Sequence, residues 1–178
     1  MPSYVAFLRA INLGSTRKFP KEAVKAAVEK AGGTAVETYI NTGNVRFDST
    51  LRSRAKLEKV LEDAFVADRG FEVPTIVFTL AELAEIAADA EALAADRDEG
   101  LRHYVSVLKD TPSAATAEAA EALSNDDERV VVRGRAAHLL LGESYQQATI
   151  HNAVVEKKLG VATNRRDTVI RAMASKWC

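Results

Sequence analysis

The stretch VETYINTGNVRF at residues 36–47 contains two short β-prone runs on either side of Asn41-Thr42-Gly43. Its composition predicts one strand over VETYI and another over NVRF, because aromatic and β-branched residues favour the pleated surface of a sheet. Gly43 can take the positive φ that a tight turn requires. The stretch is therefore predicted to be a β-hairpin.

Four predicted elements flank this hairpin in a regular order. The apolar run at 4–8 predicts a buried strand, and apolar residues at helical spacing predict helices at about 20–31 and 51–67. A strand at 75–78 completes the order β-α-β-β-α-β, the ferredoxin-like or split βαβ unit. The residues expected on the inner face of the second helix are Leu57, Val60, Leu61, Ala64 and Phe65.

The second half repeats this order without repeating the sequence. Thr79 and Glu82 form a predicted capping box for a connecting helix at about 80–95. We therefore predict an α+β fold with two ferredoxin-like halves, 1–79 and 101–178, separated by a connecting helix and an acidic loop at 80–100. The elements expected in the second half are strands at 101–108, 129–133 and 136–141, helices at about 113–123 and 148–159, a short strand GVAT at 160–163 and a last helix at 165–176, with Ile150, Ala153, Val154 and Leu159 inside the helix at 148–159.

Composition excludes several classes of protein. The chain has 178 residues and its one cysteine is Cys178, so neither a disulfide framework nor a multi-cysteine zinc site is expected. No apolar run approaches the roughly 20 residues of a membrane helix, and no signal peptide is recognisable. We expect a cytoplasmic protein that is a monomer or a weak dimer and needs no metal or cofactor.

Charge is strongly segregated along the chain, although the formal net charge is only −1. Residues 1–59 carry 11 Lys and Arg against 5 Asp and Glu, residues 60–128 carry 4 against 17, and residues 129–178 carry 9 against 3. The acidic middle segment argues against a general nucleic-acid surface, which is broadly basic. The two basic ends form one positive face if they meet in space, or they pair with the acidic segment.

The first candidate site is the loop RAINLGSTRK at 9–18, which holds Arg9, Asn12 and Gly14 ahead of a predicted helix. Free backbone N–H groups, a helix N-terminus and cationic side chains attract anions. The glycine spacing matches neither a P-loop nor a dinucleotide fingerprint. The same residue types also serve an ordinary strand-to-helix connection.

Two further segments contain candidate binding residues. Asn41, Thr42, Gly43 and Asn44 form either a plain hairpin tip or part of the same site as the loop at 9–18. In TNRRDTV at 163–169, Asn164 suits a helix N-cap, which places Arg165 and Arg166 in a first turn where they oppose the helix dipole. That arrangement indicates an anionic ligand, with Thr168 beside it, or an ion pair with the acidic segment.

Catalytic constellations are not recognisable in the sequence. His103, His138 and His151 are expected to lie far apart, with His138 a core or edge residue of a strand. No Ser lies in a G-x-S-x-G elbow, and Cys178 is terminal. Whether the protein is an enzyme stays open.

Four stretches, RAINLG, ETYINTGNVRF, RVVVRG and VEKKLGVAT, together resemble the bacterial family known as domain of unknown function 1697. The resemblance implies an α+β fold with two ferredoxin-like halves and no established activity. Ala10 and Thr42 stand where the family pattern has Gly and Ser. TNRRDTV keeps an Arg and Thr168 of the family pattern but lacks its Asn-Trp pair, and ESYQQATIHNAV lacks a family lysine, so a ligand of relatives need not be this protein's ligand.

The leading hypothesis is a binding protein for a phosphorylated or nucleotide-like small molecule. An RNA or single-strand binder is the second, although such sheets need exposed aromatic residues. A protein-interaction module and an enzyme acting on an anionic substrate are the remaining hypotheses. The residues expected to bind the ligand are Arg9, Asn12, Gly14, Asn41, Thr42, Gly43, Asn44, Arg165, Arg166 and Thr168.

Overall fold

The computed structural model of the chain describes residues 1–41, 43–95, 101–142 and 147–178. Within it the chain divides into two compact units, which we call the N-terminal unit (Met1–Leu83) and the C-terminal unit (Ala84–Lys176). Trp177 groups with the first unit and Cys178 with the second. Each unit is described below by itself.

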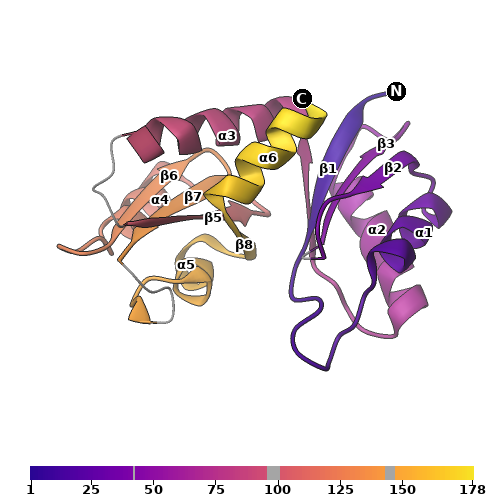
Figure 1. Cartoon of the computed structure of the whole chain (residues 1–178), viewed down its shortest axis with the longest axis horizontal. Coiled ribbons are helices and arrows are strands. Elements are labelled where there is room, and N and C mark those ends of the chain that lie inside the picture. The colour runs from indigo at the N-terminus through magenta and orange to yellow at the C-terminus, as the bar shows by residue number, and fades with distance from the viewer. Residues whose placement is uncertain (42, 96–100, 143–146) are drawn as a thin grey trace. The chain divides into compact units, whose positions relative to one another are not determined.

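The N-terminal unit is a four-stranded antiparallel sheet in the order β2-β3-β1-β4, with two helices on one face (Figure 1). This strand order confirms the ferredoxin-like prediction. Tyr4 and Phe47 lie in the core between sheet and helices, where the rings of Phe19 and Phe65 meet edge to face at 5.2 Å. The elements are β1 (Ser3–Leu8), α1 (Lys21–Lys30), β2 (Thr34–Thr38), β3 (Asn44–Asp48), α2 (Arg54–Arg69) and β4 (Thr75–Thr79), followed by the connecting helix α3 (Leu80–Ala95).

Local sequence signals explain where these helices begin and end. The Ser53 side chain accepts a hydrogen bond from the Lys56 N–H and caps α2, and Gly70 ends that helix with φ +76°. The predicted capping box at α3 is confirmed, because the Thr79 N–H donates to Glu82 at 2.7 Å and the Glu82 N–H donates to the Thr79 hydroxyl at 3.1 Å.

The C-terminal unit repeats the same topology, with the sheet order β6-β7-β5-β8. Figure 1 shows α3 and α6 on one side of this sheet and α5 on the other. The core formed by this sheet with α4 and α5 includes Leu108 and Leu139 from the strands and Val155 from α5. The elements are β5 (Arg102–Leu108), α4 (Ala114–Glu121), β6 (Arg129–Arg133), β7 (Ala136–Leu141), α5 (Asn152–Leu159), β8 (Ala162–Arg166) and α6 (Asp167–Trp177).

Glutamate side chains of the helices accept hydrogen bonds from backbone N–H groups of three edge strands, β4, β6 and β8. The donors would otherwise be open to pairing with another chain, so these glutamates protect the sheet edges. The sequence does not reveal this role, since a glutamate on a helix surface is ordinarily a solvated residue. The pairs are Glu58 with Val77 N (3.1 Å), Glu62 with Thr75 N (2.9 Å), Glu121 with Val132 N (2.9 Å) and Glu156 with Ala162 N (3.0 Å).

Several predicted boundaries and faces are wrong. The first hairpin strand is Thr34–Thr38, not 36–40, because pairing with β3 stops at Thr38 and Ile40 takes φ +51°. Helix α5 begins at Asn152, four residues later than predicted at 148. Val60 and Ala153, both expected inside, are exposed.

The last helix begins two residues later than predicted. Strand β8 continues through Arg165 and Arg166, which pair with Val105 and Tyr104 of β5. Asn164 therefore lies in the strand and is not the N-cap, and the first helical residue is Asp167. Arg166 is the N-cap and Arg165 precedes it, so neither arginine lies in the first turn as predicted, and the first-turn residue Asp167 has the charge that the helix dipole favours.

Candidate functional site

The loop between β1 and α1 contains four residues with positive φ. These are Ala10 (+57°), Asn12 (+55°), Gly14 (+59°) and Arg17 (+52°). Because Ile11 and Leu13 have negative φ, the sign alternates along residues 10–14. Alternation of this kind turns successive N–H groups toward one side and forms an anion-binding concavity called a nest.

The Asn12 side chain holds this loop in place and ties it to the next one. Its amide donates to the Phe19 carbonyl at 3.0 Å and to the Asn41 carbonyl at 2.8 Å, and its oxygen accepts from the Phe19 N–H at 2.8 Å. The loop at 9–18 and the hairpin loop at Asn41 therefore lie together, which the sequence had left open as one of two alternatives. The Asn12 amide is committed to the loops, which makes Asn12 a positioning residue.

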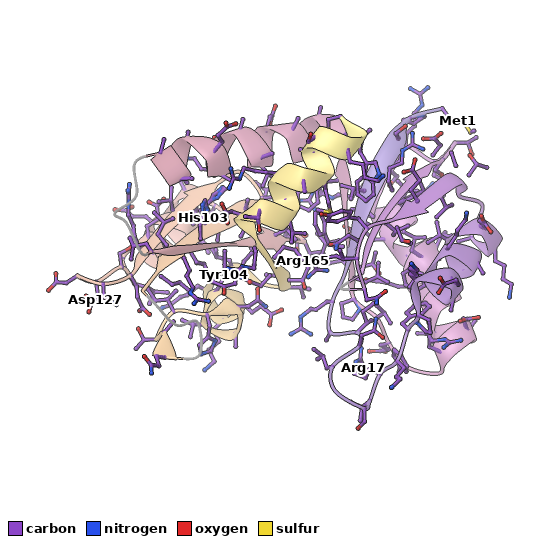
Figure 2. All side chains as sticks on the ribbon, in the orientation of Figure 1. Met1, Arg17, His103, Tyr104, Asp127 and Arg165 are labelled. Atoms are coloured by element: carbon purple, nitrogen blue, oxygen red, sulfur yellow. The ribbon has the colours of Figure 1, made fainter. Side chains whose placement is uncertain are left out.

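Arg17 is a second brace within the loop after β1 (Figure 2). Its guanidinium donates to the Ala10 carbonyl at 2.5 Å and to the Glu72 carbonyl at 2.6 Å, and it lies 4.7 Å from the centre of the Phe71 ring. Arg9 is half-buried, and its backbone N–H donates to the Pro74 carbonyl at 2.9 Å. Lys18, in contrast, is exposed.

The hairpin loop is fixed by packing. Gly43 has φ +84°, and a Cβ there would lie 2.7 Å from the Leu8 Cβ and 3.0 Å from the Ile11 Cδ1. Asn44 is 1% exposed and donates from its amide to the Tyr39 carbonyl at 3.0 Å. These residues shape the loop from within. Thr42, also predicted to bind ligand, lies outside the described residues.

Three backbone N–H groups at the tip of the first loop, those of Leu13, Gly14 and Ser15, donate to no acceptor in the described part of the chain. All three residues are exposed. The neighbouring crevice, lined by Ile11, Phe19, Lys21 and others, has a volume of about 10 Å³, which is room for about one water molecule. An anion would therefore bind on the surface of the loop tip.

The remaining predicted residues belong to the C-terminal unit. Arg165 is 8% exposed within β8, and its guanidinium donates to the Thr163 hydroxyl at 3.0 Å and to the Asn164 carbonyl at 2.8 Å. Burial lowers the pKa of Arg165 to about 10, which leaves it charged at neutral pH. Arg166 and Thr168 are exposed, and the Arg166 guanidinium lies 6.0 Å from the centre of the Tyr104 ring. One site that includes both units stays a prediction.

The C-terminal unit contains a pair of buried histidines that the sequence does not reveal. His103 and His138 are 2% and 0% exposed, and His103 Nε2 lies 3.0 Å from His138 Nδ1. The expectation that they lie far apart is wrong because β5 and β7 are neighbours and Val105 pairs with His138. Alternation then places both rings on the same face of the sheet, opposite Tyr104, as Figure 2 shows for His103.

Charged residues surround this pair. Asp167 Oδ2 lies 3.9 Å from His103 Nδ1 and accepts a hydrogen bond from Arg171 at 2.9 Å. A neutral imidazole carries one N–H, so one of the two facing ring nitrogens donates and the other accepts. Burial, followed by the positive potentials of His103 and Arg133, lowers the pKa of His138 to about 3. The His138 ring is therefore uncharged at neutral pH.

Among the residues that the structure describes, no group of three or more His, Cys, Asp and Glu is placed to hold a metal ion. None of the described helices is both long and apolar enough to cross a bilayer. Tyr4 and Phe47 lie in the core of the N-terminal unit, so neither offers its ring to a nucleic-acid base.

Comparison with known proteins places the chain in a family. A family model described as a protein of unknown function (DUF1697) matches residues 1–138. The solved structure of a conserved bacterial protein from Streptococcus pneumoniae is similar over 98% of this chain and 97% of that one, with a TM-score of 0.71 and 21% sequence identity, which shows a shared fold. No curated protein matches the sequence. Since the family model matches well over half of the chain, and residues 9–14 and 37–47 resemble that family's pattern, the chain belongs to the family of proteins of unknown function DUF1697.

Proposed function

We propose that the N-terminal unit binds a small anionic molecule, and that the loop tip at residues 13–15 receives its oxyanion group. The proposal concerns the loop that follows β1, where unbonded N–H groups and the exposed Lys18 occur together. Asn12 and Gly43 hold the loop in position without touching the anion.

The observation that carries the proposal is an internal comparison between the two units. Between β1 and α1 the chain uses twelve residues, 9–20, whereas the equivalent connection between β5 and α4 uses five, 109–113. The hairpin at the same end of the sheet uses five residues, 39–43, against two, 134–135. Ile11 and Phe19 of the longer loop lie in the core. Because the same fold closes with shorter connections in the C-terminal unit, we infer that the exposed tip at residues 13–15 serves something other than folding.

Equivalent hydrogen bonds strengthen this comparison. The Leu8 N–H donates to Gly43 at 2.8 Å, and the Leu108 N–H donates to Arg135 at 2.9 Å. Arg9 and Lys109 likewise donate from their N–H groups to the carbonyls of Pro74 and Val161, the residues just before β4 and β8. The C-terminal end of the first strand is thus hydrogen-bonded in the same way in both units, and the extra residues follow it.

Electrostatics favours an anion at this loop. The loop at residues 9–20 contains three basic and no acidic side chains, in a unit (residues 1–83) whose net charge is +2 from 12 basic and 10 acidic side chains. Unbonded N–H groups on a backbone whose φ alternates in sign add fixed positive partial charges that need no side-chain ordering. Carboxylates and phosphates are the natural ligands of such a nest.

Inorganic phosphate and AMP are suitable first probes, with binding followed residue by residue through ¹H–¹⁵N chemical shifts. We expect the largest shifts at the amides of residues 13–15. Shifts confined to other residues, or none up to tens of millimolar, would contradict the proposal.

A matched pair of variants isolates the backbone donor. Ser15→Pro removes one N–H, whereas Ser15→Ala removes only the hydroxyl and keeps that N–H. Because a hydrogen bond to a charged group is worth about 1.5–3 kcal/mol, Ser15→Pro should weaken phosphate binding about tenfold or more, and Ser15→Ala should weaken it far less. Equal losses in the two variants would indicate that the backbone donor is not used.

A second pair tests the cation. Lys18→Ala should weaken binding and lower its dependence on salt, while Lys25→Ala, which removes an exposed charge in α1, should change little. Equal effects would mean that only the overall charge of the unit attracts the anion.

A further inference from the structure

We infer that the anion bound by the N-terminal unit carries an apolar group, which packs on Leu13 and Ile40. This inference rests on the proposed function and names the chemical class of its ligand: a phosphate or carboxylate with an aryl or branched alkyl substituent. It does not concern inorganic phosphate itself.

Leu13 and Ile40 are two large apolar side chains that stay exposed in the two enlarged loops. Leu13 is 58% exposed and Ile40 is 45% exposed. Leu13 follows Asn12 and Ile40 precedes Asn41, and these two neighbours are joined by the 2.8 Å hydrogen bond between the Asn12 amide and the Asn41 carbonyl. The two apolar side chains therefore emerge from adjacent backbone, next to the unbonded N–H groups of residues 13–15.

Neither exposed side chain contributes to the hydrophobic core of the unit. Ile40 also has φ +51°, a conformation that is costly for a β-branched residue. The equivalent turn of the C-terminal unit is Gly134-Arg135, in which Gly134 takes the positive φ without a side chain. Stability thus gives no reason for an isoleucine at this position, whereas contact with a ligand does.

The apolar group of the ligand must lie on the surface of the loops, because the loop region has no internal space for it. The crevice beside Ile40, lined also by Phe19 and Val24, has a volume of about 10 Å³, too small for a ring or a branched alkyl chain. A substituent attached to an anion at residues 13–15 would therefore lie across the exposed faces of Leu13 and Ile40. Partial burial of these faces and of the substituent would add affinity that inorganic phosphate lacks.

The experiment compares inorganic phosphate with phenyl phosphate on the full chain by titration calorimetry or chemical-shift titration. We expect phenyl phosphate to bind about tenfold more tightly, since tenfold corresponds to about 1.4 kcal/mol and a few tens of Å² of apolar surface suffice. Leu13→Ser and Ile40→Thr should each reduce this preference and leave the Kd of inorganic phosphate unchanged. Val60→Thr, which alters an exposed apolar residue on α2, is the matched control and should change neither.

The outcomes separate the two proposals. Equal affinity for inorganic phosphate and phenyl phosphate would overturn the inference that the ligand carries an apolar substituent, and it would leave the proposed anion site intact. Loss of inorganic phosphate binding in Leu13→Ser would also overturn the inference, because Leu13 would then act by holding the loop. Binding of neither probe to the unaltered chain would overturn both the inference and the proposed function.

Discussion

The two units share one topology but keep their polar groups in different places. The N-terminal unit carries its unusual polar chemistry in exposed loops, at Leu13–Ser15 and beside Asn12. The C-terminal unit instead buries His103, His138 and Arg165 on one face of its sheet. Exposed N–H groups cost nothing to leave open to water, whereas buried polar groups must be paired or uncharged. This difference agrees with the anion site that we propose in the first unit, and it predicts a pH-dependent stability for the second.

The largest effect is expected where the hairpin packs against β1. Gly43→Ala should lower the free energy of unfolding by about 2–4 kcal/mol, because the new Cβ overlaps Leu8 and Ile11 and φ is positive. Gly134→Ala is the matched change in the other hairpin, where no atom lies within 4 Å, and should cost only about 1 kcal/mol. Urea unfolding measures both. Equal costs would show that the two hairpins pack alike after all.

Acidification should weaken the C-terminal unit through His138. Its pKa falls from 6.5 to about 3 on folding, so the stability it contributes is complete above pH 6.5 and is lost as pH drops toward 3. The loss is about 1.4 kcal/mol per pH unit below 6.5, or about 2.7 kcal/mol by pH 4.5.

His138→Gln should flatten the stability profile between pH 6.5 and 4.5, whereas His151→Gln, which also removes one histidine, should keep its slope. The absolute stability of His138→Gln is not the readout. A slope that His138→Gln leaves unchanged would contradict the assignment to this pair.

Glu128 should affect stability at a lower pH than His138, so the two contributions can be distinguished by the pH range in which each is lost. Burial alone would raise its pKa, but hydrogen bonds from Thr149, Asn125 and Ile150 outweigh burial and lower it below 4.5. Its contribution is therefore present above pH 4.5 and is lost only below that value. Glu128→Gln should change the slope below pH 4.5 and not above it, as followed by chemical denaturation at each pH.

Removing the Asn12 side chain, which links the loops at 9–18 and at Asn41, should destabilise the N-terminal unit alone. Asn12→Ala deletes three hydrogen bonds and places alanine at φ +55°, so we expect a loss of about 2 kcal/mol. Amide exchange at Phe19 should accelerate and phosphate affinity should fall. Unchanged exchange at Phe19 would mean that Arg17 suffices to hold the loop.

The smallest effect concerns the edge strands, which the two units protect in the same way. Glu58→Gln and Glu156→Gln each keep an acceptor oxygen but replace a charge-assisted hydrogen bond with a neutral one. Each change should cost under about 1 kcal/mol by urea unfolding. A much larger cost in one unit would show that its edge relies on the charge itself.

Local signals in the sequence were reliable wherever one residue type governs the backbone. The capping box at Thr79 and Glu82, the αL glycine at Gly70 and the strands at 129–133 and 136–141 could all be predicted. The residue types of the loop at 9–18 indicate a candidate site. They do not predict its pattern of φ signs or the hydrogen bonds by which Asn12 holds two loops together. Those depend on Phe19 and Asn41, which are brought to Asn12 only by folding.

The sequence by itself determined the order of elements, the duplication of the ferredoxin-like half and the family. These follow from periodicity, turn residues and motifs that act over a few residues. Tertiary structure decided that β8 extends through Arg165 and Arg166, that His103 meets His138, and that helix glutamates occupy the edges. Pairing between distant strands outweighs a local preference for helix at 165, because each added ladder residue satisfies backbone groups that would otherwise be buried without partners.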